Sequence, residues 1–175
     1  MIHHQRLCNA AKLCLHCLRN IAYFRASKGA IPLRVESSFW HTTENNFLEI
    51  ALFEWRELFA DQRATHHWKK LVTNQDAFLS ALLQNLSINE HEFDAYVKEM
   101  RVYRDKFIAQ TDEQNEAQMP DLSIAIISCQ QLYQSLLDDG NDGNVFPNAP
   151  PSAESYFLEH QAQGKEAFAL RRLRH

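Results

Sequence analysis

Apolar residues recur at intervals of three and four along most of the chain, which is the spacing of one face of an α-helix. Gly, Pro and capping residues separate the periodic segments; for example, Ser87 and Glu90 match a capping box that opens a helix. The pattern therefore predicts six helices, over about residues 5–25, 38–61, 75–83, 88–110, 121–138 and 153–175.

The second predicted helix carries apolar residues over more than half of its circumference. These residues are Phe47, Ile50, Ala51, Leu52, Trp55, Leu58 and Phe59. So wide an apolar surface predicts a central helix that is buried on two sides, or one that also faces a partner.

A run rich in Asp, Asn, Gly and Pro over residues 138–151 is the clearest loop in the sequence. It divides the chain into a helical bundle domain (1–139), a loop (140–152) and a C-terminal helix (153–175) for which Ser152 is a candidate N-cap. Residues that favour strands and turns are scarce. We therefore expect an all-α protein, an up-and-down helical bundle with a C-terminal helical appendage.

Composition restricts the class of protein further. A chain of 175 residues with 45% hydrophobic residues can bury a core without a disulfide or a metal. No apolar stretch approaches the ~20 residues that span a bilayer, and polar residues interrupt the N-terminal segment where a signal peptide would be apolar. Four cysteines without a disulfide-scaffold pattern fit a reducing compartment, so we expect a cytoplasmic protein without membrane contact.

Charge and metal-ligand patterns add little. A net charge of −4 argues against a protein that binds nucleic acid over its whole surface, but it allows one basic cleft. Cys14 and Cys17, with Cys8 nearby, share one helix, whereas a structural zinc needs two ligand pairs that converge. The basic segment 66–70 is typical of a turn, and the basic segment 171–174 is typical of a helix C-terminus. We expect no metal and no cofactor.

Arg104 is the anomaly in the pattern, because it lies within the apolar stripe of the helix over residues 88–110. An unpaired buried charge is unfavourable, so Arg104 either pairs with a carboxylate or opens into a polar cleft. The candidate carboxylates are those of Glu49, Glu54 and Glu57.

The sequence around this arginine resembles a known family. Residues 100–110 read Met-Arg-Val-Tyr-Arg-Asp-Lys-Phe-Ile-Ala-Gln, and Asp112 and Pro120 follow. This segment is similar to the motif of the HEPN superfamily, in particular its abortive-infection-like branch, in which Arg-Asp-Lys, two bulky residues, Ala and His stand near the end of a long helix. The similarity extends over about residues 37–137.

The resemblance implies a bundle that cleaves RNA without a metal, with two motifs facing each other across a homodimer. Arg104 would stabilise charge on the phosphate, and a His six residues later would transfer protons. This chain has Gln110 at that position, and an amide cannot carry a proton at neutral pH. We therefore expect ribonuclease activity to be lost or weakened, unless His66, His67 or His91 replaces the missing histidine.

Two interpretations of the neighbouring residues remain open. On the structural one, Asp105 and Lys106 are solvated positions on the opposite side of the helix. On the functional one, Lys106 joins Arg101, Arg104 and Gln110 in binding phosphate. The resemblance then implies RNA or a nucleotide as ligand, a role in phage defence or a toxin–antitoxin system, and a nucleotidyltransferase or antitoxin as partner. The alternatives are an active ribonuclease that uses another histidine and a protein–protein interaction module without a nucleic-acid role.

Overall fold

The computed structural model describes residues 2–29, 38–109, 119–140, 146 and 148–170. Over these residues the chain is all-α and has no strand, as the sequence predicts. The helices are α1 (Ile2–Gly29), α2 (Ser38–Trp55), α3 (Gln75–Leu86), α4 (Glu90–Ala109), α5 (Leu122–Gly140) and α6 (Ala153–Leu170), with a π turn η1 (Arg56–Ala60) and a 3₁₀ turn η2 (Trp68–Lys70).

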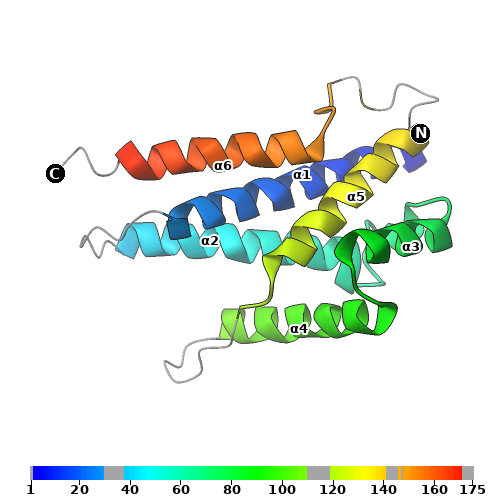
Figure 1. Ribbon diagram of the computed structural model, residues 1–175, viewed down its shortest axis with the longest axis horizontal. Helices are drawn as coiled ribbons and strands as arrows, with labels where there is room; N and C mark the ends of the chain where they lie inside the picture. The colour runs from blue at the N-terminus through cyan, green and yellow to red at the C-terminus, as the bar shows by residue number, and fades with distance from the viewer. Residues whose placement is uncertain (1, 30–37, 110–118, 141–145, 147, 171–175) are drawn as a thin grey trace.

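Helix α1 is the centre of the bundle. It packs against α2, α5 and α6, and Figure 1 shows it between α6 and α2, with α5 crossing over it. Several of its buried residues have small side chains, namely Ala10, Cys14, Cys17 and Ala22. Small side chains let neighbouring helices approach closely, so α1 can be covered on three sides. Helix α2 packs mainly against α1 and also against α4, whereas Ile50, which belongs to its wide apolar surface, and Phe53 are exposed.

An aromatic cluster joins α2 and α4 in the core. Trp55 is fully buried, stacks on Phe59 at 5.4 Å between ring centroids and meets the ring of Tyr96 edge to face. Its indole N–H donates to the Ser128 hydroxyl of α5 at 2.9 Å, so the buried polar atom is satisfied. This cluster holds the end of α2 and the middle of α4 at a fixed separation.

The capping box expected at Ser87 and Glu90 was assigned two residues too early. The reciprocal bonds join Asn89 and Glu92: Asn89 N–H donates to Glu92 Oε2 at 2.7 Å, and Glu92 N–H donates to Asn89 Oδ1 at 3.0 Å. Ser87 is instead the C-cap of α3, in the left-handed conformation with φ 55°. The chain turns sharply between α3 and α4, and Ser87 forms this turn in the left-handed conformation. Ser87 therefore ends α3, and it cannot also cap the N-terminus of α4.

The expected C-terminal helix forms over Ala153–Leu170, and Ser152 caps it by accepting the Ser155 N–H at 3.1 Å. The end of the expected helix, with the basic segment 171–174, lies outside the described residues. Helix α6 lies along α1 and adds Ala153 and Phe157 to the main core, so it is packed into the bundle (Figure 1). No helix in the described part of the chain is long and apolar enough to cross a membrane.

Gly164 is where α6 comes closest to α1. A Cβ added at Gly164 would lie 2.7 Å from the Cβ of Ala26 and 3.1 Å from Cδ1 of Tyr23. We expect Gly164→Ala to lower the free energy of unfolding by about 1–3 kcal/mol, because overpacking outweighs the gain in helix propensity. Urea denaturation followed by circular dichroism measures this change.

Gly29→Ala is the matched control, since an added Cβ there meets nothing within 4 Å. It should leave stability unchanged or slightly higher. A Gly164→Ala protein as stable as the wild type would show that α6 does not approach α1 as closely as described.

Candidate anion-binding site

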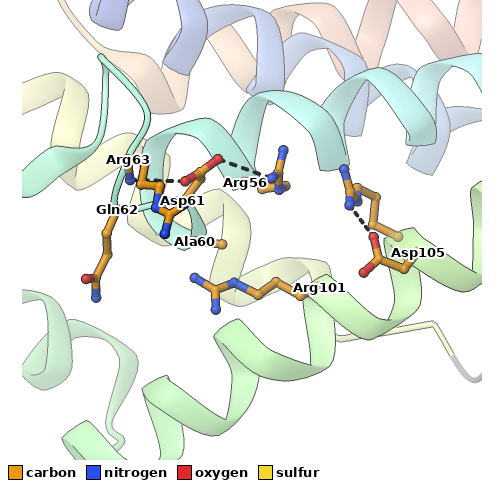
Figure 2. Close-up of a pocket in the computed structure, with 8 residues that line it drawn as sticks. Arg56, Ala60, Asp61, Gln62, Arg63, Arg101 and Asp105 are labelled. Carbon is orange, nitrogen blue, oxygen red and sulfur yellow. Dashed lines mark hydrogen bonds and ion pairs between the residues drawn. The ribbon is translucent and has the colours of Figure 1, made fainter.

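A cleft of about 560 Å³ opens between the end of α2 and the second half of α4. One wall comes from the π turn η1, which continues α2, and from the segment that follows it, and the other wall comes from α4 (Figure 2). The lining residues are Arg56, Ala60, Asp61, Gln62, Arg63, Arg101, Arg104 and Asp105. Four guanidinium groups against two carboxylates make the cleft net positive.

The π turn brings Arg56 and Asp61 together. The Asp61 N–H donates to the Arg56 carbonyl at 2.8 Å, one residue further apart than in an α-helix. As a result, the Arg56 guanidinium reaches Asp61 Oδ2 at 3.1 Å. π turns of this kind occur often at functional sites, where the extra residue redirects side chains.

Asp61 is held in its charged form. The Arg63 N–H donates to Oδ1 at 3.0 Å, and this bond, together with the charge of Arg56, lowers the pKa of the Asp61 carboxyl. Asp61 therefore fixes Arg56 in place.

Arg63 and Arg101 are exposed, and their guanidinium groups have no acceptor within the part of the chain that the structure describes. Figure 2 shows the Arg101 side chain reaching from α4 into the space below Ala60 and Asp61. These two cations have no carboxylate within ion-pair distance among the described residues, so the cleft keeps a net positive charge and is suited to an anion.

Arg104 is the most buried cation of the cleft, with 22% of its side chain exposed. Nη2 contacts the carboxylate of the neighbouring Asp105, whereas Nε is buried and has no partner in the described structure. A buried donor without an acceptor is unfavourable, and a bound oxygen would satisfy it. Arg104 thus combines both expected possibilities, an ion pair and an opening into a polar cleft.

The carboxylates proposed as partners of Arg104 lie elsewhere. Glu57 accepts from His66 at 2.6 Å, and Glu54 contacts Asn20 of α1. Glu49 is exposed. The expectation was wrong because Glu54 faces α1, where Asn20 and His16 lie, and Glu57 of η1 is engaged by His66.

The structure brings together Arg101 and Arg104 of the expected phosphate-binding set. Gln110 and the side chain of Lys106 lie outside the described residues. Asp105 was expected on the opposite side of the helix, and this was wrong, because it lines the cleft and contacts Arg104.

Sequence reasoning missed the contribution of Arg56, Asp61 and Arg63 to the cleft. Arg56 was visible only as a polar interruption of an apolar helix. The other two lie beyond the helix end, where periodicity gives no signal.

None of the three histidines considered as substitutes lines the cleft. His66 is engaged by Glu57, and His91 is exposed at the start of α4. His67 is buried, and burial lowers its pKa. It lies near Phe59 O at 3.2 Å and accepts the Lys69 N–H at 3.3 Å. No histidine of the described residues is therefore placed to exchange protons with a ligand of the cleft.

Three of the four cysteines, Cys14, Cys17 and Cys129, are fully buried in the core. Burial raises the pKa of Cys14 and Cys129, so these two thiols are protonated and unreactive at neutral pH. Among the residues described, no group of three His, Cys, Asp or Glu side chains is arranged to hold a metal ion.

The segment between Asp61 and Trp68, which carries Arg63, is anchored from outside the cleft. Lys70 Nζ donates to the carbonyls of Arg63 and Ala64, each at 2.9 Å. Arg6 of α1 donates to the Thr65 carbonyl at 3.0 Å. These bonds hold the backbone beside the cleft in one conformation.

No family model, curated protein or solved structure matches this chain significantly. The cleft can bind an anion and neutralise its charge, and its described residues include no histidine to transfer a proton.

Proposed function

We propose that this protein is a HEPN-like helical protein that binds RNA or a nucleotide through Arg104, with its ribonuclease activity lost or weakened. The observation that carries the proposal is a cleft with four arginines, in which Arg63 and Arg101 form no ion pair and Arg104 Nε is buried without an acceptor among the described residues. Arginine suits phosphate because its planar group donates two parallel hydrogen bonds and stays charged.

Two observations support loss of cleavage. The motif position for the proton-carrying histidine is Gln110, and no described histidine lines the cleft. On this proposal the cleft supplies the positive charge that stabilises a phosphate, and its described residues supply no histidine to transfer protons.

The proposal extends to a cytoplasmic homodimer in phage defence or a toxin–antitoxin system, with a nucleotidyltransferase or antitoxin as partner. Exposed apolar residues favour an interface: Ile50 and Phe53, on the solvent side of α2, are 46% and 52% exposed. Phe53 precedes Arg56 by one turn. We call Ile50 and Phe53 the apolar ridge of α2. A second copy of the chain that packs on this ridge would place its arginine cleft near that of the first copy.

RNA binding tests the proposal. We expect Arg101→Ala and Arg104→Ala each to weaken binding of a fluorescent single-stranded RNA by about tenfold at low salt and to reduce the salt slope by roughly 0.7, one phosphate contact. Fluorescence anisotropy over a salt series measures both quantities. Lys165→Ala, which removes an exposed cation of α6, is the matched control and should change neither.

Equal RNA affinity in wild type and both arginine variants would contradict the proposal. A wild type that does not bind RNA or nucleotides would favour the alternative, an interaction module that uses the ridge at Ile50 and Phe53. Thermal melts of Arg104→Ala show whether this variant is folded. Arg101 is exposed, so Arg101→Ala should not affect folding, and its RNA affinity tests the proposal independently.

A further inference from the structure

The arginine cleft carries its cations on two facing walls. Arg56 and Arg63 come from η1 and the segment that follows it, whereas Arg101 and Arg104 come from α4. Figure 2 shows the Arg101 side chain extending from α4 toward the segment that carries Asp61. The pKa of the Asp61 carboxyl is lowered by the Arg63 N–H, by Arg56 and also by the charge of Arg101. Cations from both walls therefore act on one space.

The cleft can hold an anion at two neighbouring points along α4. Arg101 and Arg104 are three residues apart, so they are neighbours on the helix surface, about 4.5 Å apart along the axis. Among the described residues, Arg101 forms no ion pair and Arg104 Nε has no acceptor. Phosphates that share a bridging oxygen lie close together, whereas a whole nucleotide unit separates consecutive phosphates of RNA. The spacing of the two arginines therefore suits linked phosphates.

The lining offers a base no surface on which to stack. Ala60 is the only apolar residue among the described residues that line the cleft, and it is buried. The preceding residue, Phe59, has its ring in the core. Single-stranded bases are usually held by stacking on exposed aromatic side chains. The cleft therefore offers contacts to phosphate and no such contact to a base.

The helix face that carries Arg101 becomes acidic outside the cleft. Toward the N-terminus of α4 it continues with Val97, Asp94 and Glu90, at intervals of four, three and four residues. Both carboxylates are exposed and form no ion pair among the described residues. An RNA backbone that followed this face would meet two repulsive charges. A compact anion that stays within the cleft of about 560 Å³ avoids them.

We propose that the cleft binds a chain of anhydride-linked phosphates, as in the 5′-triphosphate of an RNA or in a nucleoside triphosphate, without recognising the base. This inference rests on the proposed function, because it requires phosphate binding at Arg101 and Arg104. It names the part of the RNA or nucleotide that the cleft recognises. The terminal phosphates carry more charge in a smaller space than the diesters of the backbone.

Three RNAs of one sequence test the inference when their 5′ ends carry a hydroxyl, a monophosphate or a triphosphate. In EDTA and at low salt, we expect the triphosphate RNA to bind about tenfold more tightly than the hydroxyl RNA. Its salt slope should be steeper by roughly 1.4, two phosphate contacts. Fluorescence anisotropy with a 3′ label measures both quantities. Arg101→Ala should remove most of this preference, and the control Lys165→Ala should keep it.

Competition identifies the source of the phosphates. Inorganic tripolyphosphate, ATP and CTP should each displace the triphosphate RNA, and ATP and CTP should do so at equal concentrations because the base is not recognised. A triphosphate RNA that binds more tightly than ATP and CTP would identify an RNA end as the ligand. Equal affinities would identify a free nucleotide. Both results support the inference.

Two results would overturn the inference and leave RNA binding by the cleft intact. One is equal affinity for the three RNAs, weakened for all of them by Arg101→Ala, because the cleft would then recognise backbone diesters. The other is a difference of about tenfold or more between ATP and CTP, because the base would then contribute. Failure of the RNAs, the nucleotides and tripolyphosphate to bind would overturn both proposals.

Discussion

RNA cleavage in the presence of EDTA is expected to appear when His replaces Gln110. A positioned general acid or base contributes roughly 10²–10⁴ to the rate, and the cleft already supplies the positive charge that stabilises the phosphate. The wild type should therefore cleave at or near background, and Gln110→His should gain activity within that range. Denaturing gels of a labelled RNA over a time course measure the rates.

Two variants make this result specific. Gln110→Asn keeps an amide and should stay inactive, and Arg104→Ala combined with Gln110→His should lose the gained activity. Cleavage by the wild type that disappears in Arg104→Ala would instead show a working site and contradict the proposed loss of catalysis. If no variant cleaves RNA, the motif resemblance does not extend to catalytic geometry.

The second large effect is expected at Glu54, a buried carboxylate between α1 and α2. Burial raises the pKa of this carboxyl from 4.5 to about 7, although Asn20 Nδ2 donates to Oε2 at 3.4 Å. His16 Nδ1 lies 3.5 Å from Oε1, and burial lowers the pKa of His16. Arg19 and Glu57 act on Glu54 with opposite signs.

A raised carboxyl pKa means that the folded protein binds this proton more tightly than the unfolded chain. Glu54 therefore stabilises the fold below about pH 4.5, and this stability is lost as the pH rises through 7. The difference between these limits is roughly 2–3 kcal/mol. Glu54→Gln should match the wild type near pH 4.5 and exceed its free energy of unfolding by that amount at pH 8.

Urea titrations at both pH values measure this difference directly. His67 has a lowered pKa, so it destabilises the fold as the pH falls below about 6.5, in wild type and variant alike. Comparison at each pH removes its contribution. Glu49→Gln, from an exposed position of the same helix, corrects for the change in net charge. A constant difference between Glu54→Gln and wild type across the range would contradict the prediction.

Periodicity predicted the helices well because each buries a regular stripe against its neighbours. It did not identify α1 as the centre, since Ala10, Cys14 and Ala22 contribute little to an apolar pattern and are buried through close helix contacts. The capping box was misplaced for a related reason: both Ser87 and Asn89 can cap, and only the turn between α3 and α4 selects Asn89.

The candidate site was predicted in part. Arg104 was identified because a charge in an apolar stripe demands a partner, and Arg101 came with its motif. Arg56, Asp61 and Arg63 join them through a π turn and an irregular segment, whose course depends on tertiary contacts such as that between Arg6 and Thr65. Local sequence does not specify such contacts, so half of the cleft could not be predicted.

The anchoring of the segment after Asp61 has a consequence for entropy. A loop that becomes ordered on binding reduces affinity by the conformational freedom it loses. Here Lys70 and Arg6 already restrict the backbone that carries Arg63, from positions outside the cleft. The loss of freedom is incurred when the chain folds, so the cleft is preorganised and a ligand needs to order little more than the side chains of Arg63 and Arg101.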